Sequence, residues 1–253
     1  MIDRSSKTLQ EFIDDHGYII NGRWYPRVTS ILDIKAKPAL YRFYGGLSSF
    51  EEGENIKNRS AEEGTLVHEV AEALLSGKRV EVPEKIAPSI ASLLEFIRDR
   101  KIQVDEDWVE HRIINHKERY SGTIDALALI DGKFGVLDIK TSQEIYRDYN
   151  LQTSAYFAVL KDEFDKLQTR WILRIDQTQK CLKCPATLRS KGGREKVRRN
   201  GSNGDHEHVW GPMQGEIELK EFPHWQHDFE GFLGAKKLWE WENKAHLEKI
   251  GYL

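Results

Sequence analysis

The sequence predicts an α/β fold in which helices flank a central mixed sheet. Apolar runs of strand length occur at intervals along the chain: 108–115, 123–130, 134–139, 169–177 and 214–220. Between and around them lie stretches with the three- and four-residue apolar spacing of amphipathic helices. An Asp131-Gly132 pair joins two of the strands, and such a pair favours a tight hairpin because glycine accepts positive φ freely.

Composition is that of a polar globular protein. Hydrophobic residues make up 39% of the 253 residues, charged residues 31%, and the net charge is −3, so the chain as a whole has no basic field. No apolar run reaches the length of a membrane span, and the first residues lack the apolar core of a signal peptide. Two cysteines do not make a disulfide framework. We therefore expect an intracellular, cytoplasmic protein without a membrane partner.

The N-terminal part, 1–58, is predicted to be an extension of the main domain, 59–253. It contains a small hairpin that turns on Asn21-Gly22, followed by short helices at 28–34 and from Pro38 to about Gly45. Its aromatic and basic side chains either line a channel or form a small second core around which the charges are solvated.

Four longer helices are predicted, at 59–76, 88–100, 149–161 and 223–249. In the first, His68 lies at the border of the apolar stripe, and Glu72 follows four residues later in a position to support it. In the third, Gln152 and Tyr156 are four residues apart and so lie on one face.

The hairpin over 123–139 is expected to bring two carboxylates together. Asp125 lies six residues before Asp131, and Asp138 lies six residues after Gly132, so the strands place both acids near the open end. Two carboxylates in an apolar sheet repel and are costly to desolvate unless a cation lies between them. Lys140 projects to the same face as Asp138. Glu110, on the preceding strand, is either an exposed carboxylate or a further acid near this cation.

Four short motifs follow one another along residues 60–160. They are Gly64-Thr65-x-x-His68-Glu69, Gly122-x-x-Asp125, Asp138-Ile139-Lys140-Thr141 and Gln152-x-x-x-Tyr156. Together they resemble the PD-(D/E)xK nuclease superfamily, and more narrowly its RecB-like exonuclease branch, which includes the mitochondrial genome maintenance exonuclease and phage nucleases.

The resemblance implies a restriction-endonuclease-like core and metal-dependent hydrolysis of DNA, by a single-strand exonuclease rather than an endonuclease, in a phage or bacterial setting. It implies that His68, Asp125, Asp138 and the backbone carbonyl of Ile139 hold one or two Mg²⁺ or Mn²⁺ ions. Lys140 would orient water or stabilise the transition state, while Gln152 and Tyr156 position water or substrate. A recombination or replication protein is a further expected partner. The alternative is a DNA-binding or recombination accessory with the fold but without primary catalysis.

The segment 178–213 is predicted to be an insertion within the domain, too long for a structureless loop. Cys181-x-x-Cys184 and His206-x-His208, with 21 residues between the pairs, have the chemistry of a four-ligand structural zinc site. A redox role would need a thioredoxin-like context, and an iron–sulfur cluster would need four cysteines.

The insertion is also basic. Between residues 180 and 200 there are eight lysines and arginines but only one acidic residue, Glu195. This concentration is interpreted either as an arm that contacts phosphates or as a solvated loop. Arg174, on the preceding strand, either reaches a phosphate or pairs with Asp176. A second alternative function is a zinc-stabilised adaptor that docks a partner protein through 181–211. The candidate phosphate contacts are Arg174, Arg189, Lys191, Arg194, Lys196, Arg198 and Arg199.

Overall fold

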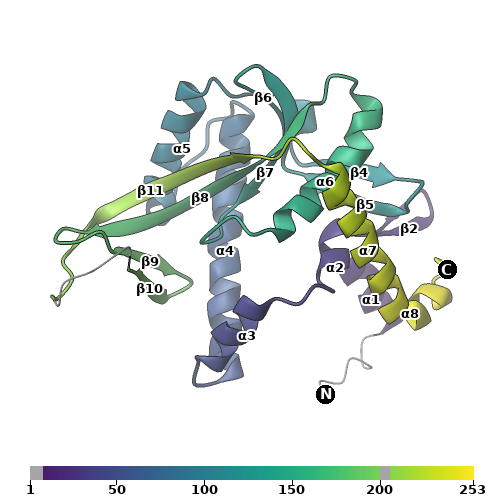
Figure 1. The fold of residues 1–253 in the computed structure, drawn as a ribbon, viewed down its shortest axis with the longest axis horizontal. Coiled ribbons are helices and arrows are strands. Elements are labelled where there is room, and N and C mark those ends of the chain that lie inside the picture. Colours follow the sequence, from purple (N-terminus) through teal and green to yellow (C-terminus); the bar gives the residue numbers. More distant parts are fainter. Residues whose placement is uncertain (1–7, 200–205) are drawn as a thin grey trace.

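The computed structural model describes residues 8–199 and 206–253 and has an α/β architecture, a mixed sheet flanked by helices (Figure 1). Across these residues the main sheet contains seven strands in the order β10-β9-β8-β7-β6-β3, with β11 also paired to β8. Only β7 and β8 run parallel; the other pairs are antiparallel. The strands are β3 (Gln103–Val104), β6 (Ala126–Ile130), β7 (Lys133–Lys140), β8 (Thr169–Cys181), β9 (Thr187–Lys191), β10 (Arg194–Arg198) and β11 (Trp210–Glu221).

Strand β8 connects the core to the inserted segment. Its first half pairs with β7, and near its end Gln179 and Lys180 pair with β9. Strand β11 follows β8 from Trp171 to Cys181, so the two strands extend beyond the core as a long ribbon (Figure 1). The described part of the insertion thus contains regular structure: the predicted strand at 169–177 continues to Cys181, and the β9–β10 hairpin follows it.

Helices cover both faces of the sheet. Helices α4 (Phe50–Leu75) and α5 (Ala87–Asp99) share one apolar cluster with alternate residues of β6, β7 and β8, including Leu137 and Ile139. Helices α6 (Asp148–Glu163) and α7 (Gln226–Glu242) share a second cluster, which includes Val136. Because side chains alternate along a strand, Asp138 and Lys140 follow Val136 toward α6.

The N-terminal elements pack into the second cluster. Phe12 and Trp24 lie with Trp239 of α7, so the predicted extension shares a core with the C-terminal helices. The predicted hairpin turn is present, with φ of 50° at Asn21 and 75° at Gly22. The remaining elements are α1 (Leu9–His16), β1 (Gly17–Ile20), β2 (Arg23–Pro26), α2 (Val28–Leu32), α3 (Pro38–Gly45), η1 (Glu84–Ile86), η2 (Glu106–Trp108), β4 (His111–Asn115), β5 (Tyr120–Ile124) and α8 (Lys244–Lys249).

Several predicted boundaries are wrong. The expected strand 123–130 breaks at Asp125, because β5 pairs with β4 in a separate two-stranded sheet whereas β6 joins the main sheet. The expected strand 108–115 begins with a helical turn, and Glu110 has a positive φ of 52° before β4 starts. The helix expected from 59 begins at Phe50, and the last helix is interrupted at Asn243. In the described part of the chain, no helix combines the length and apolar character needed to cross a membrane.

Candidate functional site

The two hairpin acids lie across from each other where β6 begins and β7 ends. Ala126 pairs with Leu137, so Asp125 and Asp138 are the next positions in the register. The Asp125 carboxylate accepts a hydrogen bond from the backbone N–H of Ile139. The Asp138 side chain is completely buried. The sequence prediction that the hairpin crowds the two carboxylates is consistent with this geometry.

Asp138 is held by groups from β7 and α6. The Lys140 Nζ lies 2.6 Å from Asp138 Oδ2, and Gln152 Nε2 donates to Asp138 Oδ1 at 3.1 Å. Gln152 Nε2 also lies 3.0 Å from the Tyr156 hydroxyl. The Asp138 Oδ2 atom forms this ion pair but accepts no well-oriented hydrogen bond from the described residues. That buried oxygen therefore retains an unused acceptor position.

Helix α4 contributes the other side of the site. His68 Nδ1 lies 3.9 Å from Asp125 Oδ2 and 3.6 Å from Glu72 Oε1. One donor atom from each of His68, Glu72 and Asp125 lies within 4.8 Å of the others, a spacing that could hold one metal ion. A cavity of about 560 Å³ opens beside them, lined by His68, Glu72, Glu110 and Thr141 among others.

The charges in this cluster strongly influence one another. Burial, reinforced by the Asp138 carboxylate, raises the pKa of Asp125 to about 6. Burial and the Glu72 carboxylate raise the pKa of Glu110 to about 7. Burial opposes protonation of Lys140, but the Asp138 and Asp125 carboxylates outweigh it and raise the Lys140 pKa. An excess of buried negative charge of this kind favours a cation.

Glu72 and Glu110 belong to the site, although the resemblance did not include them. Glu72 lies on the same helical face as His68, and the four-residue spacing was a usable signal. Glu110 had only a weak signal, because an acid on a predicted edge strand is usually exposed. It reaches the site because the chain turns at positive φ and its N–H bonds to the Asp125 carbonyl at 3.1 Å.

Two glycines allow the elements to approach closely. A Cβ on Gly122 would lie 2.5 Å from the Tyr156 ring, so the strand before Asp125 and helix α6 meet there. A Cβ on Gly64 would lie 2.8 Å from Thr141 Oγ1, which joins α4 to the end of β7. A larger side chain at either glycine would therefore require its neighbour to shift.

The Cys/His residues also come together, at the end of the β8–β11 ribbon. Cys181 Sγ lies 3.8 Å from His206 Nε2, and Cys184 Sγ lies 3.6 Å from His208 Nδ1. The four ligand atoms lie within 4.8 Å of one another and could bind a metal ion. Burial opposes ionisation of Cys181, yet the Lys183 N–H and the two imidazoles lower its pKa to about 5.

The candidate phosphate-contacting bases fall into two groups. Arg174, Arg189 and Lys191 face inward: Arg174 pairs with Asp176, Glu216 and Glu218, which matches the alternative of internal pairing. Arg194, Lys196, Arg198 and Arg199 lie on or just after β10, closer to solvent. Arg198, for example, has 56% of its side chain exposed.

Comparisons with known proteins add little. No protein-family model matches the chain, and no curated protein matches it. Among solved structures the chain is similar to the protein of the "Crystal structure of SSO0001", at 14% identity and a TM-score of 0.37, over 84% of this chain and 74% of that one. So distant a likeness says nothing about function, which must come from the site itself.

Proposed function

We propose that this protein is a metal-dependent nuclease that hydrolyses DNA phosphodiester bonds, a RecB-like exonuclease of the PD-(D/E)xK superfamily with a restriction-endonuclease-like core. The main support is the convergence of Asp125, Asp138 and Lys140 at the end of one hairpin, with His68 reaching the same place from α4. Acid, acid and lysine beside a histidine suit cleavage of a phosphodiester at a bound cation.

The donor set fits Mg²⁺ or Mn²⁺. Carboxylate oxygens from Asp125 and Glu72 suit either ion, and the imidazole of His68 favours Mn²⁺. Asp138 adds a buried oxygen with an unused acceptor position. A bound divalent cation would lower the pKa of a coordinated water and neutralise charge on the phosphate.

The remaining residues have roles that follow from their contacts. Lys140, paired with Asp138, keeps its proton near neutral pH and is placed to stabilise negative charge on a phosphoryl oxygen or to orient the attacking water. Gln152 fixes one oxygen of Asp138 and, with Tyr156, closes the α6 side of the site. His68 is oriented by Glu72, as carboxylates commonly orient histidine ligands.

The test is digestion of end-labelled linear and circular single-stranded DNA with Mg²⁺ or Mn²⁺. We expect cleavage of the linear strand and its loss in Asp138→Asn. Asp131→Asn is the matched control, because it makes the same change in the hairpin turn, where Asp131 pairs only at the surface with Arg100. Equal cleavage by the Asp138 variant and wild type would contradict the proposal. Cleavage of circular strands would show that the activity is endonucleolytic.

The proposal includes zinc as the metal of the Cys/His group. A tetrahedral zinc ion with two sulfur and two nitrogen ligands has S···N separations of about 3.6 Å, given its usual bond lengths. The S···N distances of 3.8 Å between Cys181 and His206 and 3.6 Å between Cys184 and His208 fit that geometry. The lowered pKa of Cys181 favours the thiolate that zinc binds. Zinc would also stabilise a segment with few apolar residues.

Zinc is tested by elemental analysis of the purified protein. We expect about one zinc per chain in wild type and its loss in Cys184→Ser. Lys183→Ser, between the cysteines, is the matched control because its side chain is outside the ligand set. Full zinc content in the Cys184 variant would exclude this site.

A further inference from the structure

The β9–β10 hairpin is inserted between the two halves of the Cys/His group. Cys184 precedes β9, and His206 follows β10 in the sequence, with 21 residues between them. A metal ion bound by both pairs would therefore close the base of this hairpin. Closing a long loop removes conformational freedom from everything within it.

The tip of the hairpin docks on α4. The Gly192 N–H donates to Glu63 Oε2 at 3.2 Å, and a Cβ at Gly192 would lie 2.1 Å from Ser60 Oγ. Gly192 and Gly193 both have positive φ, as a tight two-residue turn requires. Beside them Arg194 lies over the Phe43 ring of α3, 4.8 Å from its centre. The tip of the hairpin is thus held against α4 at Glu63, which is five residues before His68 on the same helix.

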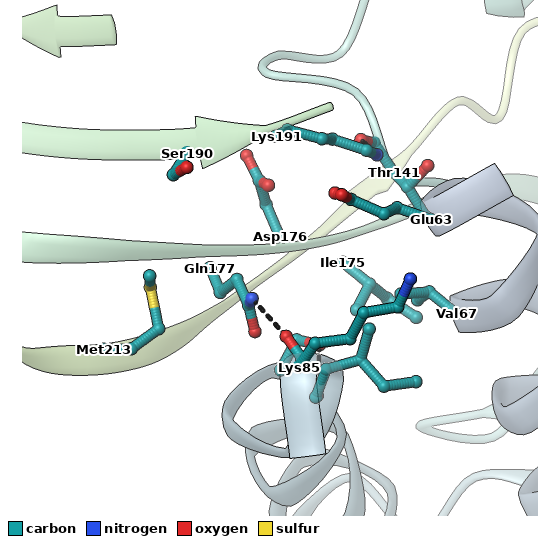
Figure 2. A pocket seen from close by; sticks show the side chains of 12 residues that line it. Glu63, Val67, Lys85, Thr141, Ile175, Asp176, Gln177, Ser190, Lys191 and Met213 are labelled. Atoms are coloured by element: carbon teal, nitrogen blue, oxygen red, sulfur yellow. Dashed lines mark hydrogen bonds between the residues drawn. The ribbon is translucent and has the colours of Figure 1, made fainter. Parts of the chain in front are cut away.

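One side of the hairpin binds the end of the candidate catalytic strand. Lys191 Nζ donates to the Thr141 carbonyl oxygen at 2.5 Å, and Arg189 Nη2 donates to the same oxygen at 3.2 Å. Figure 2 shows Lys191 reaching toward Thr141, beside Glu63 and Asp176. These residues line a cavity of about 220 Å³. Asp176 in turn accepts from Arg189 Nε at 2.7 Å.

Thr141 is the residue after Lys140 and is also the point where β7 meets α4. Its hydroxyl lies against Gly64, four residues before His68. The β7–β8 pairing ends at Lys140 and Arg174, so Thr141 lies just beyond the paired part of the strand. There the two bases of the hairpin donate hydrogen bonds to its carbonyl oxygen.

We propose that Arg189 and Lys191 are positioning residues for the candidate catalytic centre. Through the Thr141 carbonyl they fix the end of β7, which carries Asp138 and Lys140. The hairpin that carries these two bases is in turn held by the metal site of Cys181, Cys184, His206 and His208. This inference rests on the proposed nuclease function. It links the two candidate metal sites, because a metal ion bound at the Cys/His site would set the geometry of the site that contains Asp138.

The contacts separate this role from direct binding of DNA. Arg189 has only 18% of its side chain exposed, and its nitrogens already bond to Asp176 and Thr141. Lys191 is likewise partly buried. These partly buried donors already have internal partners and are therefore less available to a phosphate than Arg198 on β10, which is more than half exposed. Loss of Lys191 should thus affect catalysis rather than DNA affinity.

The experiment compares Lys191→Met, Lys191→Arg and wild type with a single-stranded oligonucleotide in Mn²⁺. We expect kcat to fall about tenfold or more in the methionine variant, with KM within twofold, and to recover largely in the arginine variant, which can donate again. Lys237→Met, an exposed lysine on α7 outside the basic segment, is the matched control and should leave both constants unchanged. A raised KM with unchanged kcat would instead make Lys191 a phosphate contact, and no change in either would overturn the inference.

The link to the Cys/His site is tested with Cys184→Ser and His208→Cys. The first should lose zinc and lower kcat as Lys191→Met does; the second retains a four-ligand zinc set and should keep kcat. Cys184→Ser with wild-type kcat would break the link between the sites.

Binding of Mn²⁺, followed by its electron paramagnetic resonance signal, separates this inference from the nuclease assignment. We expect Lys191→Met to bind Mn²⁺ severalfold more weakly than wild type whether or not wild type cleaves DNA. If Lys191→Met binds Mn²⁺ as tightly as an active wild type, the positioning role is wrong and the nuclease assignment is unaffected. If wild type does not cleave DNA but Lys191→Met still binds Mn²⁺ more weakly, only the nuclease assignment is wrong.

Discussion

The Asp125 carboxylate accepts a hydrogen bond from the backbone N–H of Ile139, the residue directly after Asp138. This contact locks the two acids across the hairpin, because one acid holds the backbone that carries the other. The Asp125 backbone is itself held by Glu110, whose N–H donates to its carbonyl. Hydrogen bonds that involve the main chain thus help to hold the acidic cluster in place.

Asparagine at position 125 should therefore stabilise the protein without added Mg²⁺ or Mn²⁺. The amide can still accept from Ile139, but it removes one of two buried negative charges that the surroundings disfavour. We expect Asp125→Asn to increase the free energy of unfolding by about 1–2 kcal/mol at pH 7.5, measured in urea. Added Mn²⁺ should stabilise wild type and not the variant. A destabilised variant, or equal stabilisation of both by Mn²⁺, would contradict the metal site.

Alanine at Gly122 should disturb the contact between β5 and α6. Its Cβ would lie 2.5 Å from the Tyr156 ring, which is buried and held by Gln152. Overpacking of this kind costs about 1–3 kcal/mol in unfolding free energy. Gly45→Ala is the control, because no atom lies within 4 Å of the added methyl group. In a double-mutant cycle, Tyr156→Leu should reduce the cost of Gly122→Ala; strictly additive losses would show that the two residues do not interact.

Local signals in the sequence predicted much of the core. The Asp131-Gly132 turn is present, with φ of 50° and 79°, because few residue pairs adopt that conformation so easily. The break at Asp125 could not be predicted from the same run. Residues on both sides are apolar and strand-forming, and only the separate pairing of β5 with β4 decides that the run belongs to two sheets.

Polar composition hid two other elements. The first half of α4, from Phe50, lacks a continuous apolar stripe because much of it is exposed, so only its capping serine, Ser49, marked the start. The β9–β10 hairpin turns on Gly192-Gly193, a recognisable turn signal, but its strands are mostly charged. Its structure depends on contacts distant in sequence, with Thr141 and Glu63, which no local pattern contains.

The exposed bases of β10 should contribute to DNA binding through charge alone. Binding of a fluorescent single strand is best measured in the Asp138→Asn background, in which the proposed function predicts no cleavage. We expect Arg198→Ala to reduce the slope of log affinity against log salt by about 0.7, the value for one phosphate contact on a single strand. Arg98→Ala, a highly exposed arginine on α5, should not change it. The interpretation of β10 as a phosphate-contacting arm would be wrong if both variants gave the wild-type slope.

The Lys191 ammonium should make stability depend on pH in the alkaline range. Burial, and after it the neighbouring Arg189 guanidinium, lowers its pKa to about 8, below the 10.5 of an ordinary lysine. Between these values the unfolded chain binds more protons than the folded one, so stability rises with pH. This is the reverse of a lysine that gains an acidic partner on folding.

From pH 7 to 9.5 we expect wild type to gain about 1–2 kcal/mol in unfolding free energy relative to Lys191→Met, after allowing for partial solvent exposure. The comparison with the variant cancels other groups that titrate in this range, and urea denaturation at several pH values measures it. Parallel stability curves for the two proteins would show that Lys191 is not buried against Thr141 and Arg189. The same burial lowers the Lys191 pKa and brings its ammonium group into contact with the Thr141 carbonyl. Without that burial, Lys191 would not hold the end of β7.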